Sequence, residues 1–149
     1  MAKTATITHP DTSLQIKRTF KAPRAKVFQA WTDSAVLKQW FAPSDDFSVP
    51  IAEVDLRVGG KYRIAMQAPD GVQHIAVGAY REIDAPRKLV FTWSWEKSQM
   101  PETLVTVEFN ERSGSTEMVF THELFPSVEE RDHHNKGWIG CLDRLAKIF

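Results

Sequence analysis

The residues able to do chemistry are few and scattered. His133 and His134 are neighbours in a predicted helix, so their side chains point about 100° apart, a poor geometry for joint metal binding. Glu129 and Glu130 stand four residues before them and are expected to pair with them on the helix surface. We therefore expect no metal site.

His122 is the most interesting titratable residue. Strand alternation places it with Met118 and Phe120 on a face expected to be buried. A histidine there acts as a general acid or base, anchors a ligand, or is simply hydrogen-bonded at the rim of a cavity. Cys141, in mid-helix without an evident histidine and acid, is expected to serve packing. The remaining polar candidates form no recognised catalytic pattern: Tyr62, His74, Arg81 and Glu117.

Composition excludes several classes of function. Lysine plus arginine and aspartate plus glutamate both number 19, so the net charge is zero and does not favour nucleic acid or an anionic membrane. The single cysteine excludes an internal disulfide and indicates a reducing compartment. No signal peptide is evident, and no apolar run approaches the roughly 18 residues that cross a bilayer. We expect a cytoplasmic protein with a flexible segment at 1–13.

Periodicity predicts the elements that must position these residues. Alternation over 14–21 predicts a strand, and apolar spacings of three and four predict two short helices, one after Pro23 and one before Pro43. From 47 to 124, turn residues recur between β-branched and aromatic runs, as in a meander of antiparallel strands. The "RVGGKY" glycines join two of these strands, which favours a turn over a phosphate loop. The six strands are predicted at 49–58, 61–68, 72–83, 88–97, 103–110 and 115–123.

A helix of about twenty residues is predicted at the C-terminus, because Ser127 and Glu130 form a capping-box signature. Gly137 and Gly140 each weaken that helix by up to about 1 kcal/mol relative to alanine. We expect them to let the backbone approach the sheet closely, or to leave room near Trp138 for a cavity. A helix laid over a curved antiparallel sheet is an α+β arrangement.

Four motifs carry a family resemblance: "VFQAWTDSAVLKQWFAP", "DLRVGGKYRIAMQAPDG", "GAYREIDAPRKLVFTWSW" and "GWIGCLDRLAKIF". In this order they resemble the activator of heat-shock-protein-90 ATPase homologue family, within the START/SRPBCC helix-grip superfamily of pollen-allergen-like and polyketide cyclase-like proteins. The resemblance spans 14–149. It implies a single helix-grip domain with a seven-stranded curved antiparallel sheet, two short helices and one long C-terminal helix enclosing an apolar pocket. It leaves activity open, because the superfamily includes carriers, cyclases, hydrolases and a chaperone activator.

Alternation selects the side chains expected to face that pocket. In "KLVFTWSWEK" every second residue is large and apolar, so this face should point inward. A stripe of this kind is more often plain core than a binding surface, but a helix gripping a curved sheet favours a cavity. The predicted pocket residues are Tyr62, Ile64, Met66, Phe91, Trp93, Trp95, Val107, Phe109, Phe120, His122, Trp138, Cys141, Leu142 and Leu145.

Three functions fit this sequence. We favour binding of a small apolar or aromatic ligand, without catalytic residue, metal or organic cofactor. The first alternative is a cyclase- or hydrolase-type enzyme that uses His122. The second is a heat-shock chaperone partner with a role in the stress response. The eukaryotic activators carry an additional amino-terminal domain for the chaperone, and this chain has room only for the helix-grip domain. We expect a monomer, or a homodimer paired through a sheet edge.

Overall fold

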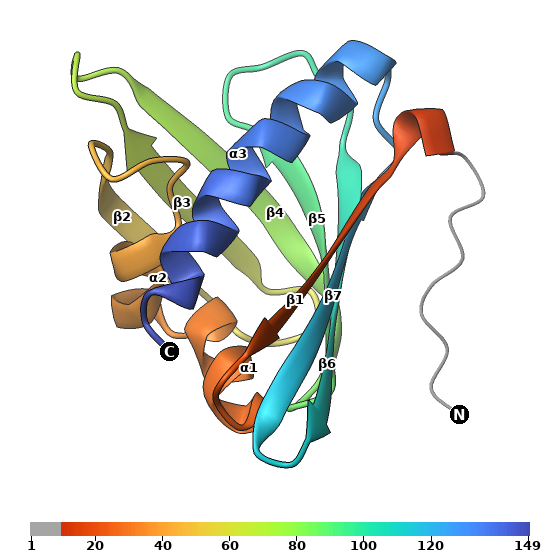
Figure 1. Cartoon of the computed structure of the whole chain (residues 1–149). Coiled ribbons are helices and arrows are strands. Elements are labelled where there is room, and N and C mark those ends of the chain that lie inside the picture. Colours follow the sequence, from red (N-terminus) through yellow and green to blue (C-terminus); the bar gives the residue numbers. More distant parts are fainter. Residues whose placement is uncertain (1–9) are drawn as a thin grey trace.

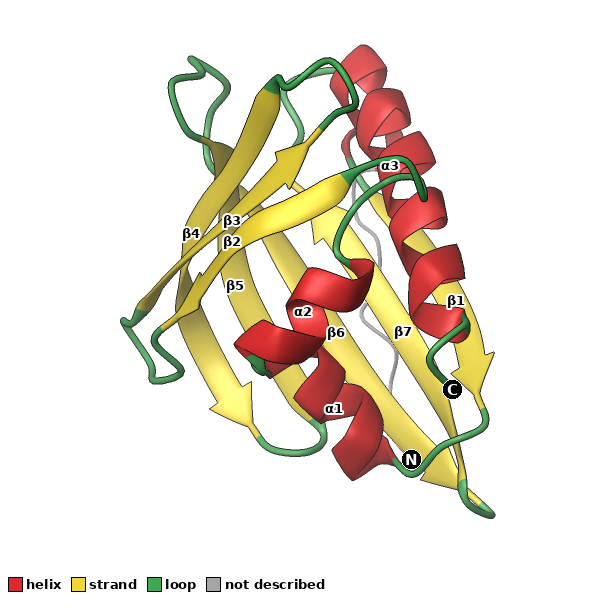
Figure 2. Ribbon diagram, turned by 90° about the vertical axis from the view of Figure 1, so that its left-hand side faces the viewer, coloured by secondary structure: helices red, strands yellow, loops and turns green. Residues whose placement is uncertain are grey.

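The computed structural model describes residues 10–149, which form a seven-stranded sheet, three α-helices and a short 3-10 turn. Helix α3 (Val128–Ala146) crosses the concave face of the sheet diagonally (Figure 1). Helices α1 (Arg24–Thr32) and α2 (Ser34–Trp40) lie together near one end of that face (Figure 2). This arrangement confirms the predicted α+β helix-grip fold. The strands are β1 (Leu14–Phe20), β2 (Ser48–Val54), β3 (Lys61–Gln67), β4 (Gln73–Asp84), β5 (Lys88–Trp95), β6 (Thr103–Arg112) and β7 (Ser115–Glu123).

The sheet is a meander to which the first strand is added at one side. Its order is β1-β7-β6-β5-β4-β3-β2, and every neighbouring pair is antiparallel. Strand β1 returns beside β7, where Leu14 lies opposite His122 and Phe20 opposite Thr116. The predicted run of hairpins is therefore confirmed, with β1 and β2 as the outer strands.

Strand β2 is shorter than predicted. The sequence indicated 49–58, whereas β2 ends at Val54. The chain then turns: the backbone N–H of Arg57 donates to the carbonyl of Asp55 at 2.9 Å, and Gly59 has a φ of 84°. Only glycine adopts that conformation without strain. The glycine pair thus makes the turn into β3, as predicted, but the turn begins earlier.

A bulge bends the sheet between β4 and β5. The register shifts between Tyr80 and Glu82, and the N–H of Ala79 donates to Oγ1 of Thr92 at 2.9 Å. Bulges bend a strand and increase its twist. The bend helps to give the sheet the concave face on which α3 lies.

Local signals explain where α3 begins and which side it buries. Oγ of Ser127 accepts a hydrogen bond from the N–H of Glu130 at 3.2 Å, which confirms the predicted cap. Glu129 and Glu130 in the first turn complement the positive end of the helix dipole. The buried side follows the 3.6-residue period and consists of His134, Trp138, Cys141, Leu142 and Leu145.

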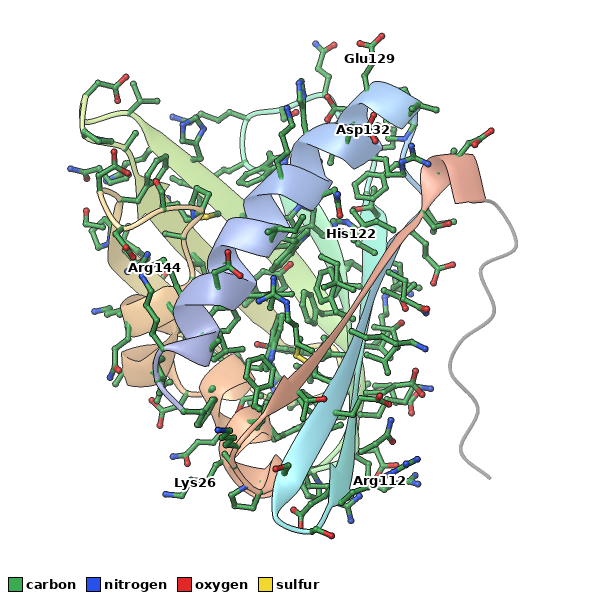
Figure 3. All side chains as sticks on the ribbon, in the orientation of Figure 1. Lys26, Arg112, His122, Glu129, Asp132 and Arg144 are labelled. Carbon is green, nitrogen blue, oxygen red and sulfur yellow. The ribbon has the colours of Figure 1, made fainter. Side chains whose placement is uncertain are left out.

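The C-terminal end of α3, with the residue that follows it, is fixed to the last turn of α2 and to the loop after it. Figure 3 shows the side chain of Arg144 directed away from the helix axis toward α2. Its guanidinium donates to the carbonyls of Gln39 at 3.1 Å and Ser44 at 3.4 Å. The ammonium of Lys147 donates to the carboxylate of Asp45 at 2.9 Å. These contacts place the loop that carries Pro43 directly against the helix.

The expected flexible segment, 1–13, falls partly outside the described residues, since 1–9 are not described. Within the described part, Pro10–Thr12 forms the 3-10 turn and Ser13 is buried. The carbonyl of Thr12 accepts a hydrogen bond from the N–H of Phe125 at 3.0 Å. Residues 10–13 are therefore part of the fold.

Candidate functional site

A pocket of about 490 Å³ opens between α3, the loop after α2 and strands β3 to β5. His74 and His133 are exposed at its mouth, while Met66, Trp93 and Trp138 are buried in its wall. Its volume lies within the roughly 300–1,000 Å³ that is usual for ligand pockets. The lining consists of Phe41, Pro43, Phe47, Met66, His74, Trp93, Trp95, Glu130, His133, His134, Gly137, Trp138 and Cys141.

Aromatic rings make up most of the inner wall. The ring centroid of Trp93 lies 5.0 Å from that of Trp138 and 5.2 Å from that of Trp95. Phe41, directly after α2, lies 5.6 Å from Trp138 with its ring nearly perpendicular. These are separations at which aromatic rings attract one another. Together the rings, tilted or perpendicular to one another, give the interior of the pocket an apolar aromatic lining.

His134 holds Trp95 in this wall. The indole N–H of Trp95 donates to Nε2 of His134 at 2.9 Å, so that nitrogen carries no proton. The proton is therefore on Nδ1, which donates to the carbonyl of Glu130 at 2.7 Å. Burial lowers the pKa of His134 below its usual 6.5, against a smaller opposing effect of the Glu130 carbonyl. The imidazole is neutral and both of its nitrogens are occupied.

His122 holds Trp138 in the same way. The indole N–H of Trp138 donates to Nδ1 of His122 at 3.0 Å, which places the proton on Nε2, 2.7 Å from Oγ1 of Thr103. The Thr103 hydroxyl in turn donates to the carbonyl of Trp93 at 3.1 Å. Burial, and to a lesser extent the neighbouring His134, lowers the pKa of His122 well below 6.5. His122 lies between α3 and the sheet (Figure 3), fully buried, and is not part of the pocket lining.

The other polar candidates do not converge on the pocket. The hydroxyl of Tyr62 donates to the carbonyl of Thr92 at 2.5 Å, and burial raises the pKa of Tyr62 well above its usual 10.0. The guanidinium of Arg81 lies 3.5 Å from the carboxylate of Glu102 in an exposed ion pair. Glu117 is exposed on β7. Among these candidates only His74 reaches the pocket.

The structure divides the predicted pocket residues into three groups. Met66, Trp93, Trp95, Trp138 and Cys141 line the pocket. Tyr62, Ile64 and Phe91 line a separate interior cavity of about 10 Å³ beside α1 and α2. The rest are buried in the core and touch neither space: Val107, Phe109, Phe120, His122, Leu142 and Leu145.

His134 is the main residue that sequence reasoning misplaced. It was expected to pair with Glu130 on the helix surface, and that expectation is wrong, because His134 is only 8% exposed. A signal was present: His134 stands four residues before Trp138 and seven before Cys141, so it lies on the buried stripe of α3. The other missed lining residues come from the mouth, the loop after α2 and the helix backbone: Phe41, Pro43, Phe47, His74, Glu130, His133 and Gly137.

The two glycines of α3 have different surroundings. Beyond the neighbouring turn of its own helix, a Cβ at Gly137 would meet no atom within 4 Å, and this residue lines the pocket. A Cβ at Gly140 would overlap the carbonyl of Pro43. The expected close approach of the helix backbone is therefore real, but it is made to the loop after α2 rather than to the sheet. The expected room beside Trp138 is provided by Gly137.

Cys141 faces the pocket as a protonated thiol. Burial raises its pKa from 9.0 to about 12, so it is not a ready nucleophile. Within residues 10–149, no three His, Cys, Asp or Glu side chains gather in a way that would bind a metal ion. No helix in that part of the chain has the length and apolar character to cross a membrane.

Comparison with solved structures finds the same fold in bacterial proteins. A crystal structure of a protein from Chromobacterium violaceum, 25% identical, superposes with a TM-score of 0.84 over 94% of this chain and 97% of that chain. A solution structure of a protein from Staphylococcus epidermidis, 27% identical, superposes with a TM-score of 0.79 over 96% of this chain and 92% of that chain. The AHSA1 protein from Silicibacter pomeroyi, 24% identical, shares the fold with a TM-score of 0.80 over 91% and 95%.

Comparison with families and with curated proteins gives two results. No curated protein matches the chain. The profile of the family described as activator of Hsp90 ATPase homolog 1-like protein matches residues 21–149. That range includes both short helices, strands β2 to β7 and the helix over the pocket. The chain therefore belongs to the activator of Hsp90 ATPase homolog 1-like family.

Proposed function

We propose that this protein binds a small, planar, largely apolar molecule in the pocket beneath α3. The observation that carries the proposal is the pocket itself, about 490 Å³ with a wall of aromatic rings. Gly137 supports it, because this helix position leaves open space where any other residue would place a side chain. Helix stability alone favours alanine there, so the glycine is explained by the space that it preserves.

The wall is organised for binding before a ligand arrives. Trp95 and Trp138 are each fixed by a hydrogen bond to a buried histidine, His134 and His122. A ligand that stacks on fixed rings does not have to order them, so less affinity is lost in side-chain entropy. Stacking on a rigid aromatic surface selects flat ligands over bulky aliphatic ones.

The same contacts support binding rather than catalysis. Both nitrogens of His122 are engaged in hydrogen bonds and neither faces the pocket. The thiol of Cys141 is protonated at neutral pH. A general acid or base has to reach the proton that it transfers, and the buried wall offers no such group among the described residues. Activation of a chaperone ATPase, which the family name mentions, stays a prediction for this chain.

The proposal is tested by a substitution in α3 that places a larger side chain in the pocket. Gly137→Leu places a branched side chain in the open space without a clash at Cβ. The neutral fluorescent probe N-phenyl-1-naphthylamine should bind the wild-type protein saturably with enhanced emission. Its affinity should fall about tenfold or more in the variant, a loss of about 1.4 kcal/mol or more.

The control is Ile139→Ala, which alters the same helix at a side chain that is 40% exposed and outside the pocket lining. This variant should bind the probe as the wild type does. Circular dichroism should show that Gly137→Leu remains folded, since leucine favours a helix more than glycine does. Equal affinity in wild type and Gly137→Leu, or no saturable binding to the wild type, would contradict the proposal.

A further inference from the structure

One tryptophan of the pocket wall has an indole N–H without an acceptor. The N–H groups of Trp95 and Trp138 are bound by histidine nitrogens. Trp93 lies between these two rings and is 2% exposed, yet its Nε1 has no hydrogen-bond partner among the described residues. Buried polar groups in folded proteins are nearly always paired, so an unpaired one requires an explanation.

The position and surroundings of Trp93 indicate that its unpaired N–H has a function in the pocket. Its carbonyl is held by the Thr103 hydroxyl at 3.1 Å, and its ring is in contact with two fixed rings. The side chain that bears the unpaired donor is therefore part of the pocket wall, and its backbone is anchored by the Thr103 hydroxyl. An indole nitrogen only donates, so the missing partner is an acceptor.

The other buried side chains of the wall offer no free nitrogen or oxygen acceptor to a ligand that donates a hydrogen bond. Nε2 of His134, the ring nitrogen without a proton, already accepts from Trp95. Cys141 offers a protonated thiol, which is a weak donor. Phe41 and Met66, also buried in the lining, provide no nitrogen or oxygen on their side chains. The buried side chains thus present an unpaired N–H and no unpaired nitrogen or oxygen acceptor.

Charge narrows the ligand further. The pocket lining contains no lysine or arginine, it includes Glu130, and its exposed histidines, His74 and His133, lie at the mouth rather than in the buried wall. An anionic ligand would lose its hydration in an apolar pocket without gaining a cationic partner, which is strongly unfavourable. An uncharged oxygen, as in a ketone, loses much less hydration energy on entering and still accepts a hydrogen bond, although a weaker one.

We propose that the ligand is an uncharged aromatic ketone, or a molecule with an equivalent carbonyl, whose oxygen accepts a hydrogen bond from Nε1 of Trp93. This rests on the proposed function and adds the chemical class of the ligand. Nε1 is shielded from water, so the bond replaces no protein–water bond at the nitrogen. Since Nε1 itself has no accessible surface, the oxygen reaches it after a small shift of the Trp93 ring edge, which no hydrogen bond of its own holds in place.

The test compares two probes of nearly identical shape, 2-acetylnaphthalene and 2-isopropenylnaphthalene, which differ in C=O against C=CH2. Each is titrated into the wild-type protein and into Trp93→3-benzothienylalanine, which keeps the bicyclic shape and replaces the N–H with sulfur. The ratio of the two dissociation constants is compared between proteins, because this cancels the different hydration of the probes. We expect the preference for the ketone to fall about fivefold in the variant, the usual size of one net hydrogen bond.

The matched control is the same replacement at Trp31. Its Nε1 is also buried and unpaired among the described residues, but Trp31 lines the small interior cavity and not the pocket. The probe ratio should stay at the wild-type value in this protein. A ratio that does not respond at position 93, or that responds equally at position 31, overturns the inference and leaves the proposed function standing. Failure of both probes to bind the wild-type protein overturns both.

Discussion

At the scale of single residues, the pocket depends on two neutral histidines that each accept an indole N–H. If His134 takes up a proton at Nε2, the new N–H faces the N–H of Trp95, and the hydrogen bond is lost. The same holds for Nδ1 of His122 and the indole of Trp138. Both rings are buried, so their charged forms are also poorly solvated.

The first prediction concerns stability and pH. The pKa values of His122 and His134 are lowered by folding, so below the usual value of 6.5 the unfolded chain binds more protons than the folded one. The contribution of these two neutral histidines to the free energy of unfolding is therefore complete above pH 6.5. It decreases as the pH falls from 6.5 toward the pKa values of the folded protein. Urea unfolding at pH 5 to 8 should give a slope approaching about 1.4 kcal/mol per pH unit for each histidine.

The matched variant is His134→Gln, which retains a side-chain acceptor for Trp95 and does not titrate. Its stability should fall less steeply below pH 6.5 than that of the wild type. At pH 8 both histidines are neutral in the folded and the unfolded chain, so the comparison there measures packing alone. If the free energy of unfolding changes with pH equally steeply in both proteins, His134 does not contribute to the pH dependence of stability.

Sequence reasoning placed His122 on the inner face correctly, because strand alternation alone determines that side. Its partners could not be predicted, since Trp138 lies 16 residues away and approaches only when α3 packs on the sheet. His134 was missed for a related reason. A histidine four residues after a glutamate, as His134 is after Glu130, has the pattern of a surface pair on a helix. Only the complete apolar stripe of α3 shows that His134 is buried.

At the scale of elements, α3 uses its two glycines for two purposes. Gly140 lets the helix touch the carbonyl of Pro43, and Gly137 keeps the pocket open. The strands and helices themselves followed from period and turn residues, with one notable exception. The early end of β2 at Val54 was missed, because alternation continues into a segment that Gly59 forces to turn.

The second prediction separates the glycines by stability. Gly140→Ala should destabilise the protein by about 1–3 kcal/mol, because the new methyl group overlaps backbone that cannot move independently of the loop. Gly137→Ala should stabilise it by about 0.5–1 kcal/mol, since alanine favours the helix and its methyl group meets no atom within 4 Å. Urea unfolding of the two variants measures both values. Equal effects of the same sign would contradict the assignment.

At the scale of the molecule, the pocket is the space that the core does not fill. Alternation correctly marked Val107, Phe109 and Phe120 as inward-facing, yet they are packed core beneath α1 and α3 rather than pocket wall. Which part of an interior stays empty depends on summed side-chain volumes and on the position of the helix. Neither is contained in a periodic pattern, so the sequence predicted the enclosing fold better than the cavity.

The family and the fold do not by themselves determine an activity, because one scaffold serves many functions. The feature of this chain that bears on its function is the wall of Trp93, Trp95 and Trp138, in which two indoles are fixed by histidines and one indole N–H has no partner among the described residues. These features support the proposal that the protein binds a flat, uncharged ligand.

The most direct test is to observe the tryptophans during ligand binding. The chain has five tryptophans, and their indole N–H signals are resolved by ¹⁵N NMR after assignment by single substitution. Titration with 2-acetylnaphthalene should shift the signals of Trp93, Trp95 and Trp138. The signal of Trp40 should stay in place, since its N–H is bound to the carbonyl of Ala30 at 2.9 Å and the residue lies outside the pocket lining. Saturable shifts confined to the three lining residues are the predicted result, and shifts centred on Trp40, or none at saturating ligand, would contradict binding in this pocket.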